Sequence, residues 1–182
     1  MFRKLVQVAV LIAGGLALGG CPTEGSKTAA PAKRPPAPDY QQAMAPSSAA
    51  INKAACYNPA DLTIIRSRML HQELAVVYLQ CQNAGGTRAF ETIYASYVAK
   101  YNSELGSNAR SMQQLAGRKR FNVDVVVTEF SNRMAQHAPV DKEFCSRGLR
   151  AMEWALDPKA TSLAMVPPPY DLGPEMNIYP CQ

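Results

Sequence analysis

From Asn58 onward the sequence repeats apolar side chains at steps of three and four residues, and this spacing constrains the fold more than any other feature. Asn58 is a good N-cap, and Pro59 suits the first position of a helix. The segment 83–86, which contains two glycines, ends the pattern after Gln82. The sequence therefore predicts a first helix over about 59–82. Its expected buried face holds Leu62, Ile65, Met69, Leu70, Leu74, Val77 and Cys81.

The same spacing predicts further helices. The second helix is expected at about 87–105 and ends at a break formed by Gly106-Ser107-Asn108. A short helix follows this break and runs to about Gly117, and two more are expected at about 122–136 and about 141–156. The run Val125–Val127 would also suit a strand, but a single strand without partners is unstable. Residues 159–182 lack the pattern and are rich in proline. The prediction is an all-α bundle of four to five helices with an extended C-terminal tail.

The second expected helix has an aromatic face. It holds Phe90, Tyr94, Tyr97, Val98, Tyr101 and Leu105 at helical spacing. Such a face is typical of a helix that packs into the core. The alternative is that these side chains line a groove for a small apolar ligand between helices.

The charge balance argues against a nucleic-acid partner. The whole chain has a net charge of +5, and residues 51–182 hold 14 basic and 12 acidic side chains. A nucleic-acid-binding domain normally concentrates a strong basic excess on one face. The basic cluster Arg118–Arg120 is interpreted as a solvated helix end or turn, with contact to anionic lipid headgroups as the alternative.

The first 21 residues have the order of a secretory signal peptide. Arg3 and Lys4 are followed by an apolar run from Leu5 to Leu18, which is short for a membrane span of roughly 20 residues. Two glycines then precede Cys21. Small residues directly before a cysteine make this segment resemble the lipobox of bacterial lipoproteins.

The resemblance to lipoproteins implies a diacylglyceryl group on Cys21 and an acylated new N-terminus. Two or more acyl chains anchor a protein stably to a membrane. Pro22 follows the cysteine, so the aspartate that retains such lipoproteins in the inner membrane is absent. The expected location is therefore the cell envelope, anchored by lipid in the outer membrane and facing the periplasm.

The chain is expected to have three parts. Residues 1–20 are the signal peptide, and residues 21–50 are the lipidated cysteine with a disordered tether. The tether is rich in alanine and proline and has too few large apolar side chains to offset the entropy lost on ordering. Residues 51–182 are the helical domain with its C-terminal tail.

Four cysteines remain in the expected mature domain, and an even number in an exported protein indicates disulfides. A helix over 59–81 would be ~33 Å long, so Cys56 and Cys81 would lie at opposite ends of it. If the first and last helices pack antiparallel, Cys81 lies beside Cys145, and Cys56 lies beside the tail that holds Cys181. The sequence therefore predicts the pairs Cys81–Cys145 and Cys56–Cys181.

A second resemblance covers about residues 62–150. Its residues are Glu73-Leu74, Cys81, Tyr94, Tyr97-Val98, Lys100-Tyr101, Glu104-Leu105 and Phe144-Cys145. This pattern resembles a group of small helical exported bacterial proteins of unassigned function. The group supplies no catalytic residue, and Cys56 and Cys181 are additions to its pattern.

Few residues suggest a reaction. His71 and His137 lack zinc-ligand spacing and are interpreted as solvated or capping residues. An enzyme that cleaves peptidoglycan would need two carboxylates at a cleft, and Glu73 and Glu91 are the pair that the sequence offers. The alternative is that these carboxylates form salt bridges with the arginines at 68 and 88. No cofactor, metal or catalytic residue is expected.

The tail offers aromatic and proline surface at 167–170 and 179–180. Partner grooves accept such extended segments, but Cys181 could equally fix the tail across the bundle to cover apolar surface. We therefore expect a non-catalytic module that binds or scaffolds another envelope protein and contacts the membrane through Cys21. The alternatives are a peptidoglycan-directed hydrolase, a hydrolase inhibitor, or a binder of a small apolar ligand.

Overall fold

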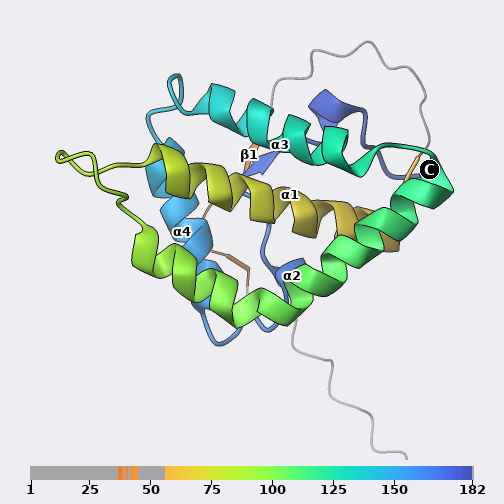
Figure 1. The fold of residues 1–182 in the computed structure, drawn as a ribbon, viewed down its shortest axis with the longest axis horizontal. Coiled ribbons are helices and arrows are strands. Elements are labelled where there is room, and N and C mark those ends of the chain that lie inside the picture. The colour runs from red at the N-terminus through yellow and green to blue at the C-terminus, as the bar shows by residue number, and fades with distance from the viewer. Residues whose placement is uncertain (1–36, 39, 41, 45–55, 182) are drawn as a thin grey trace, which may run out of the picture. The chain divides into compact units, whose positions relative to one another are not determined.

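Helix α1 (Pro59–Gln80) is the central element of the computed structural model, which describes residues 37, 38, 40, 42–44 and 56–181. Around it pack α2 (Glu91–Lys119), α3 (Val123–His137), α4 (Phe144–Leu156) and the 3-10 turn η1 (Leu163–Met165). Figure 1 shows α1 between α2 and α3. The predicted all-α fold is confirmed.

The local sequence explains where α1 begins and ends. The side chain of Asn58 accepts a hydrogen bond of 2.8 Å from the backbone N–H of Asp61, and Pro59 occupies the first turn, as predicted. The helix ends where the N–H of Cys81 donates to the carbonyl of Val77. Leu70, Leu74 and Val77 are fully buried, as predicted. Burial also extends to polar positions, because other elements cover several sides of this helix.

The predicted break at Gly106-Ser107-Asn108 is wrong. Helix α2 is 29 residues long. It continues through these three residues and includes the segment that was predicted as a separate short helix. Figure 1 shows that α2 changes direction along its length and wraps around α1. Glycine and serine permit a bend without ending a helix. The side-chain amide of buried Asn108 donates a hydrogen bond of 2.9 Å to the carbonyl of Ile64 and so ties α2 to α1, while its Oδ1 has no hydrogen-bond partner among the described residues.

Residues 159–181 form what we term the C-terminal strap. Leu163, Val166, Tyr170 and Leu172 are at most 3% exposed, so the strap covers apolar surface, as predicted. Its last residues pair with the start of the domain: the N–H of Tyr57 donates to the carbonyl of Tyr179.

The two predicted cysteine pairs are bonded. Cys81, which caps α1, joins Cys145 in the first turn of α4, with 5.8 Å between Cα atoms. Cys56 joins Cys181 across 4.7 Å between Cα atoms. The end of α1 thus lies beside the start of α4, which is the antiparallel packing that the prediction required.

Part of the predicted tether is ordered, which corrects the expected boundary at residue 50. Tyr40 is 8% exposed, and its hydroxyl donates to the carbonyl of Pro167. Strand β1 (Ala43–Met44) pairs in parallel with β2 (Tyr170–Asp171) in the strap. The large ring of Tyr40 supplies the apolar surface that the rest of this segment lacks. The predicted signal peptide, Cys21 and the other tether residues lie outside the described part of the chain.

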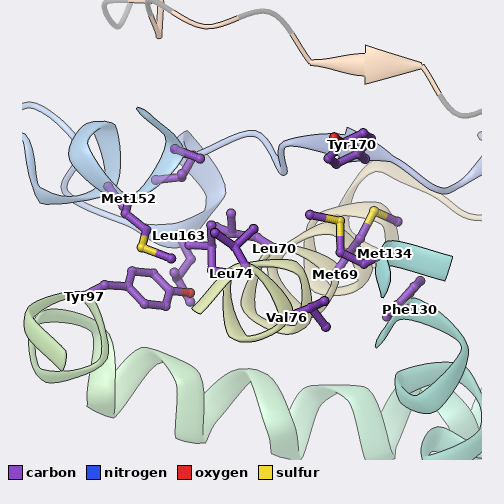
Figure 2. Packing of buried hydrophobic residues seen from close by; sticks show 14 of the residues in the cluster. Met69, Leu70, Leu74, Val76, Tyr97, Phe130, Met134, Met152, Leu163 and Tyr170 are labelled. Carbon is purple, nitrogen blue, oxygen red and sulfur yellow. The ribbon is translucent and has the colours of Figure 1, made fainter. Parts of the chain in front are cut away.

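One cluster of buried side chains joins all four helices and the strap. Figure 2 shows Leu70 and Leu74 of α1, with Tyr97 of α2 toward one side and Phe130 of α3 toward the other. Tyr97 and Tyr101 are at most 3% exposed, so most of the aromatic face of α2 belongs to the core.

Gly148 lets α4 approach α1 closely. A methyl group at residue 148 would lie 2.4 Å from Cγ1 of Val77. Gly148→Ala is therefore expected to lower the free energy of unfolding by about 1–3 kcal/mol, as overpacking in a dense core does. Chemical denaturation measures this loss. Val77→Ala is the matched partner variant: the double variant should lose less than the sum of the two single losses, and additive losses would contradict the clash.

Candidate binding site between helix α1 and the strap

A hollow of about 270 Å³ lies between α1 and the C-terminal strap. We call it the α1–strap hollow. Its walls come from α1, from the strap around η1 and from the residue that precedes β1. The lining residues are Gln42, Thr63, Arg66, Ser67, Leu163, Ala164, Met165, Val166, Pro167 and Pro168.

The α1 wall is polar. Arg66 and Ser67 lie three and four residues after Thr63, so both neighbour Thr63 on the surface of the helix. Thr63 donates its hydroxyl to the carbonyl of Pro59 at 2.9 Å. Ser67 is 6% exposed, and its hydroxyl has no hydrogen-bond partner among the described residues. Arg66 is exposed and forms no ion pair with any carboxylate that the structure describes.

The strap wall is held by hydrogen bonds from several elements. The indole of Trp154 on α4 donates 3.2 Å to the carbonyl of Met165. The N–H of Leu163 donates a hydrogen bond of 2.9 Å to the carboxylate of Glu104 on α2. Because helices on two sides hold this wall, the hollow is a preformed feature of the fold.

The hollow has a positive electrostatic character. Arg66 is the only charged side chain among the described residues that line it. A second hollow beside it, formed under residues 171–180 of the strap, shares Arg66 but also contains Asp171. An anion is therefore favoured in the first hollow and disfavoured in the second.

Glu73, which the sequence offered for catalysis, is fully buried beneath the strap. Its Oε2 accepts a hydrogen bond of 3.0 Å from the backbone N–H of Tyr170, and its Oε1 has no hydrogen-bond partner among the described residues. Burial raises the pKa of Glu73 well above its usual value, the hydrogen bond from Tyr170 opposes this, and the charge of Asp171 adds to it. A carboxyl enclosed in this way has no open cleft for a substrate.

Glu91 lies elsewhere, exposed at the first turn of α2. It lines a shallow hollow with the rings of Tyr78 and Tyr94, which stack 4.7 Å apart. The expected salt bridges of Glu73 and Glu91 are wrong, because neither carboxylate forms an ion pair with a described residue. Arg88 instead donates to the carbonyl of Leu79.

Both histidines are only partly exposed, so neither is the fully solvated residue that the sequence interpretation allowed, and His137 lies in the last turn of α3. Burial, with the charge of Arg68, lowers the pKa of His71 to about 4, and its Nδ1 has no hydrogen-bond partner. His137 stacks on Tyr170 with 4.5 Å between ring centroids and lies 4.0 Å from Glu175. Both rings help to pack the fold.

The basic cluster lies at the end of α2, as predicted, but two of its members are paired. Arg118 bonds Asp61 at 2.8 Å, and Lys119 donates 2.9 Å to the carbonyl of Cys56. Arg120 adopts the left-handed conformation that ends the helix. These contacts tie the end of α2 to the start of α1.

Sequence reasoning did not single out Arg66, Ser67 or Gln42. No motif marks them, because polar residues beside the apolar face of a helix usually face solvent. The one usable signal in the sequence was Cys181. Its predicted bond to Cys56 brings the tail back to the start of α1, where the tail must cover part of that helix.

Among the described residues, no group of three or more histidine, cysteine, aspartate or glutamate side chains is arranged to hold a metal ion. The described helices include none that is both long and apolar enough to cross a membrane. Comparison with known protein families, curated proteins and solved structures found no match.

Proposed function

We propose that this chain is a lipid-anchored module of the bacterial cell envelope that binds another envelope protein without catalysing a reaction. Its anchor is the lipid on Cys21, and it faces the periplasm from the outer membrane. The order of the first 21 residues supports the anchor. The two disulfides support an oxidising compartment, because such bonds persist mainly in exported proteins.

The observation that carries the proposal of binding is the α1–strap hollow, whose Arg66 forms no ion pair with the described carboxylates. An exposed guanidinium beside a hydroxyl and apolar strap residues is suited to recognition, because a few placed polar groups fix the orientation of a ligand. By contrast, the carboxyl of Glu73 is enclosed and Glu91 lies on the surface. This geometry favours binding over two-carboxylate hydrolysis.

Site-specific photo-crosslinking in cells tests the proposal. A photoreactive residue at Thr63, which is exposed and lines the hollow, is expected to capture one envelope protein. The same residue at Gln113, exposed on α2, should not capture it. Arg66→Glu should reduce the Thr63 product about tenfold or more, since a charge-assisted contact is replaced by repulsion.

The controls separate location from binding. Cys21→Ser should abolish metabolic labelling with palmitate and remove the chain from the membrane fraction, which would weaken capture of an outer-membrane partner. Equal capture from residues 63 and 113, or capture that Arg66→Glu leaves unchanged, would contradict binding at the hollow. Recovery of glycan fragments in place of a protein would support a peptidoglycan-directed role.

A further inference from the structure

We propose that the α1–strap hollow binds the C-terminal end of a peptide, with the terminal carboxylate on Arg66 and the last side chain against the strap. This inference rests on the proposed function and specifies what part of a partner the hollow takes. It follows from the charge, the hydrogen-bonding groups and the apolar surface that meet there.

The charge selects an anion. Arg66 is the only charged side chain of the lining, and its guanidinium forms no ion pair with the described residues. Its planar donors match the two oxygens of a carboxylate. The neighbouring hollow contains Asp171, so an anion bound to Arg66 would lie on the Ser67 side, away from that carboxylate.

The hydrogen-bonding groups fit a peptide end better than a bare anion. Ser67 is 6% exposed and its hydroxyl is unpartnered among the described residues, so a bound acceptor or donor would satisfy it. Gln42, on the other wall, offers an amide that can donate and accept. A peptide end supplies both a carboxylate and a backbone amide to these groups.

The remaining surface fits an apolar side chain. Among the apolar strap residues that line the hollow, Ala164 is exposed and Met165 and Pro167 are partly exposed, so these three offer a ligand apolar surface. The hollow of about 270 Å³ is as large as about nine water molecules in the liquid, which is the scale of a short peptide end. A small inorganic anion would leave this surface uncovered.

The single tryptophan provides a reporter. Trp154 donates its indole N–H to the carbonyl of Met165, which lines the hollow, and no other tryptophan is present. We would therefore titrate the full ¹⁵N-labelled chain in detergent with N-acetyl-alanyl-alanine. Its free acid is expected to shift the indole N–H signal and the fluorescence of Trp154, and its C-terminal amide should bind at least about tenfold more weakly.

Variants of Arg66 test the assigned contact. Arg66→Gln should weaken binding of the acid by about ten- to a hundredfold, and Arg66→Lys should retain part of it. Because Arg66 is exposed and forms no ion pair within the described part of the chain, the melting temperature should stay unchanged in both variants. Arg118→Gln is the matched control, since Arg118 is an exposed arginine that pairs with Asp61 and lines no part of the hollow.

Three results would overturn the inference: equal binding of acid and amide, full binding by Arg66→Gln, or no binding of the acid at millimolar concentration. Acetate that binds as tightly as the peptide would show that the hollow takes any carboxylate and would refute the peptide assignment. These outcomes are distinct from failure of the proposed function. A protein captured from Thr63 in cells would uphold partner binding even if the carboxylate contact were absent.

Discussion

Replacing both Cys81 and Cys145 with alanine should lower the free energy of unfolding by about 4 kcal/mol, the value that the chain-entropy model gives for a loop of this size. The bond closes a loop between two cysteines that are 64 residues apart in the sequence. It also joins the end of α1 to the start of α4, and Cys81 is only 2% exposed, so its loss removes core contacts as well. Urea denaturation followed by circular dichroism measures the change.

The second disulfide is the matched control. Cys56 and Cys181 are 125 residues apart in the sequence. The Cys81–Cys145 bond already closes 64 of these residues into its own loop, so the Cys56–Cys181 bond closes a loop of the remaining 61. The entropic terms of the two bonds are therefore similar. Because Cys56 and Cys181 are exposed, we expect their removal to have the smaller effect. A larger loss from this pair would show that closure of the strap, and not core packing, dominates stability.

Glu73→Gln should make the protein more stable at neutral pH and leave its stability at pH 4 nearly unchanged. Glutamine imitates the protonated carboxyl and keeps an oxygen that can accept from the N–H of Tyr170. In the parent chain the carboxyl is fully buried, and its Oε1 has no hydrogen-bond partner among the described residues, so its ionised form costs free energy. Denaturant titrations of both proteins from pH 4 to 8 measure the difference.

The sign of this change in stability with pH follows from the direction in which folding shifts the pKa of Glu73. Burial raises the pKa of Glu73 above its usual 4.5, so the folded state keeps the proton to a higher pH than the unfolded state does. The stabilising contribution is full below pH 4.5 and is lost as the pH rises through the folded value, by at most about 1.4 kcal/mol for each pH unit.

His71 acts in the opposite direction. Its folded pKa of about 4 lies below its usual 6.5, so its contribution is present above pH 6.5 and is lost as the pH falls toward 4. The two slopes partly cancel in the parent chain. The difference between Glu73→Gln and the parent removes the contribution of His71, and a difference that does not grow between pH 5 and 7 would contradict the buried carboxyl.

Most of the helical architecture could be predicted because amphipathic spacing and capping residues are local properties. The N-cap at Asn58 and the buried face of α1 needed only neighbouring residues in the chain. The break at Gly106 was wrong for a non-local reason. Asn108 donates to a carbonyl of α1, and packing against that helix keeps α2 continuous where the local sequence favours an end.

The contacts beneath the strap could not be predicted in the same way. Glu73 is a charged residue on a helix, yet it is fully buried and accepts a hydrogen bond from the N–H of Tyr170, 97 residues away. Tyr40 likewise belongs to a segment whose composition favours disorder, yet its ring is buried and its hydroxyl bonds the strap. Both outcomes depend on contacts between distant parts of the chain.

By itself, the sequence determined that most of residues 59–156 form helices and that Cys56 and Cys81, at opposite ends of the first helix, do not pair. Helical spacing and chain length restrict these features without knowledge of the rest of the fold. Only the tertiary structure decided that α2 bends without breaking, that Glu73 is enclosed, and that Arg66 and Ser67 face a hollow. The bend of α2 depends on its packing against α1, and the other two features arise where the strap returns across α1; these contacts join residues far apart in the sequence, so no local pattern encodes them.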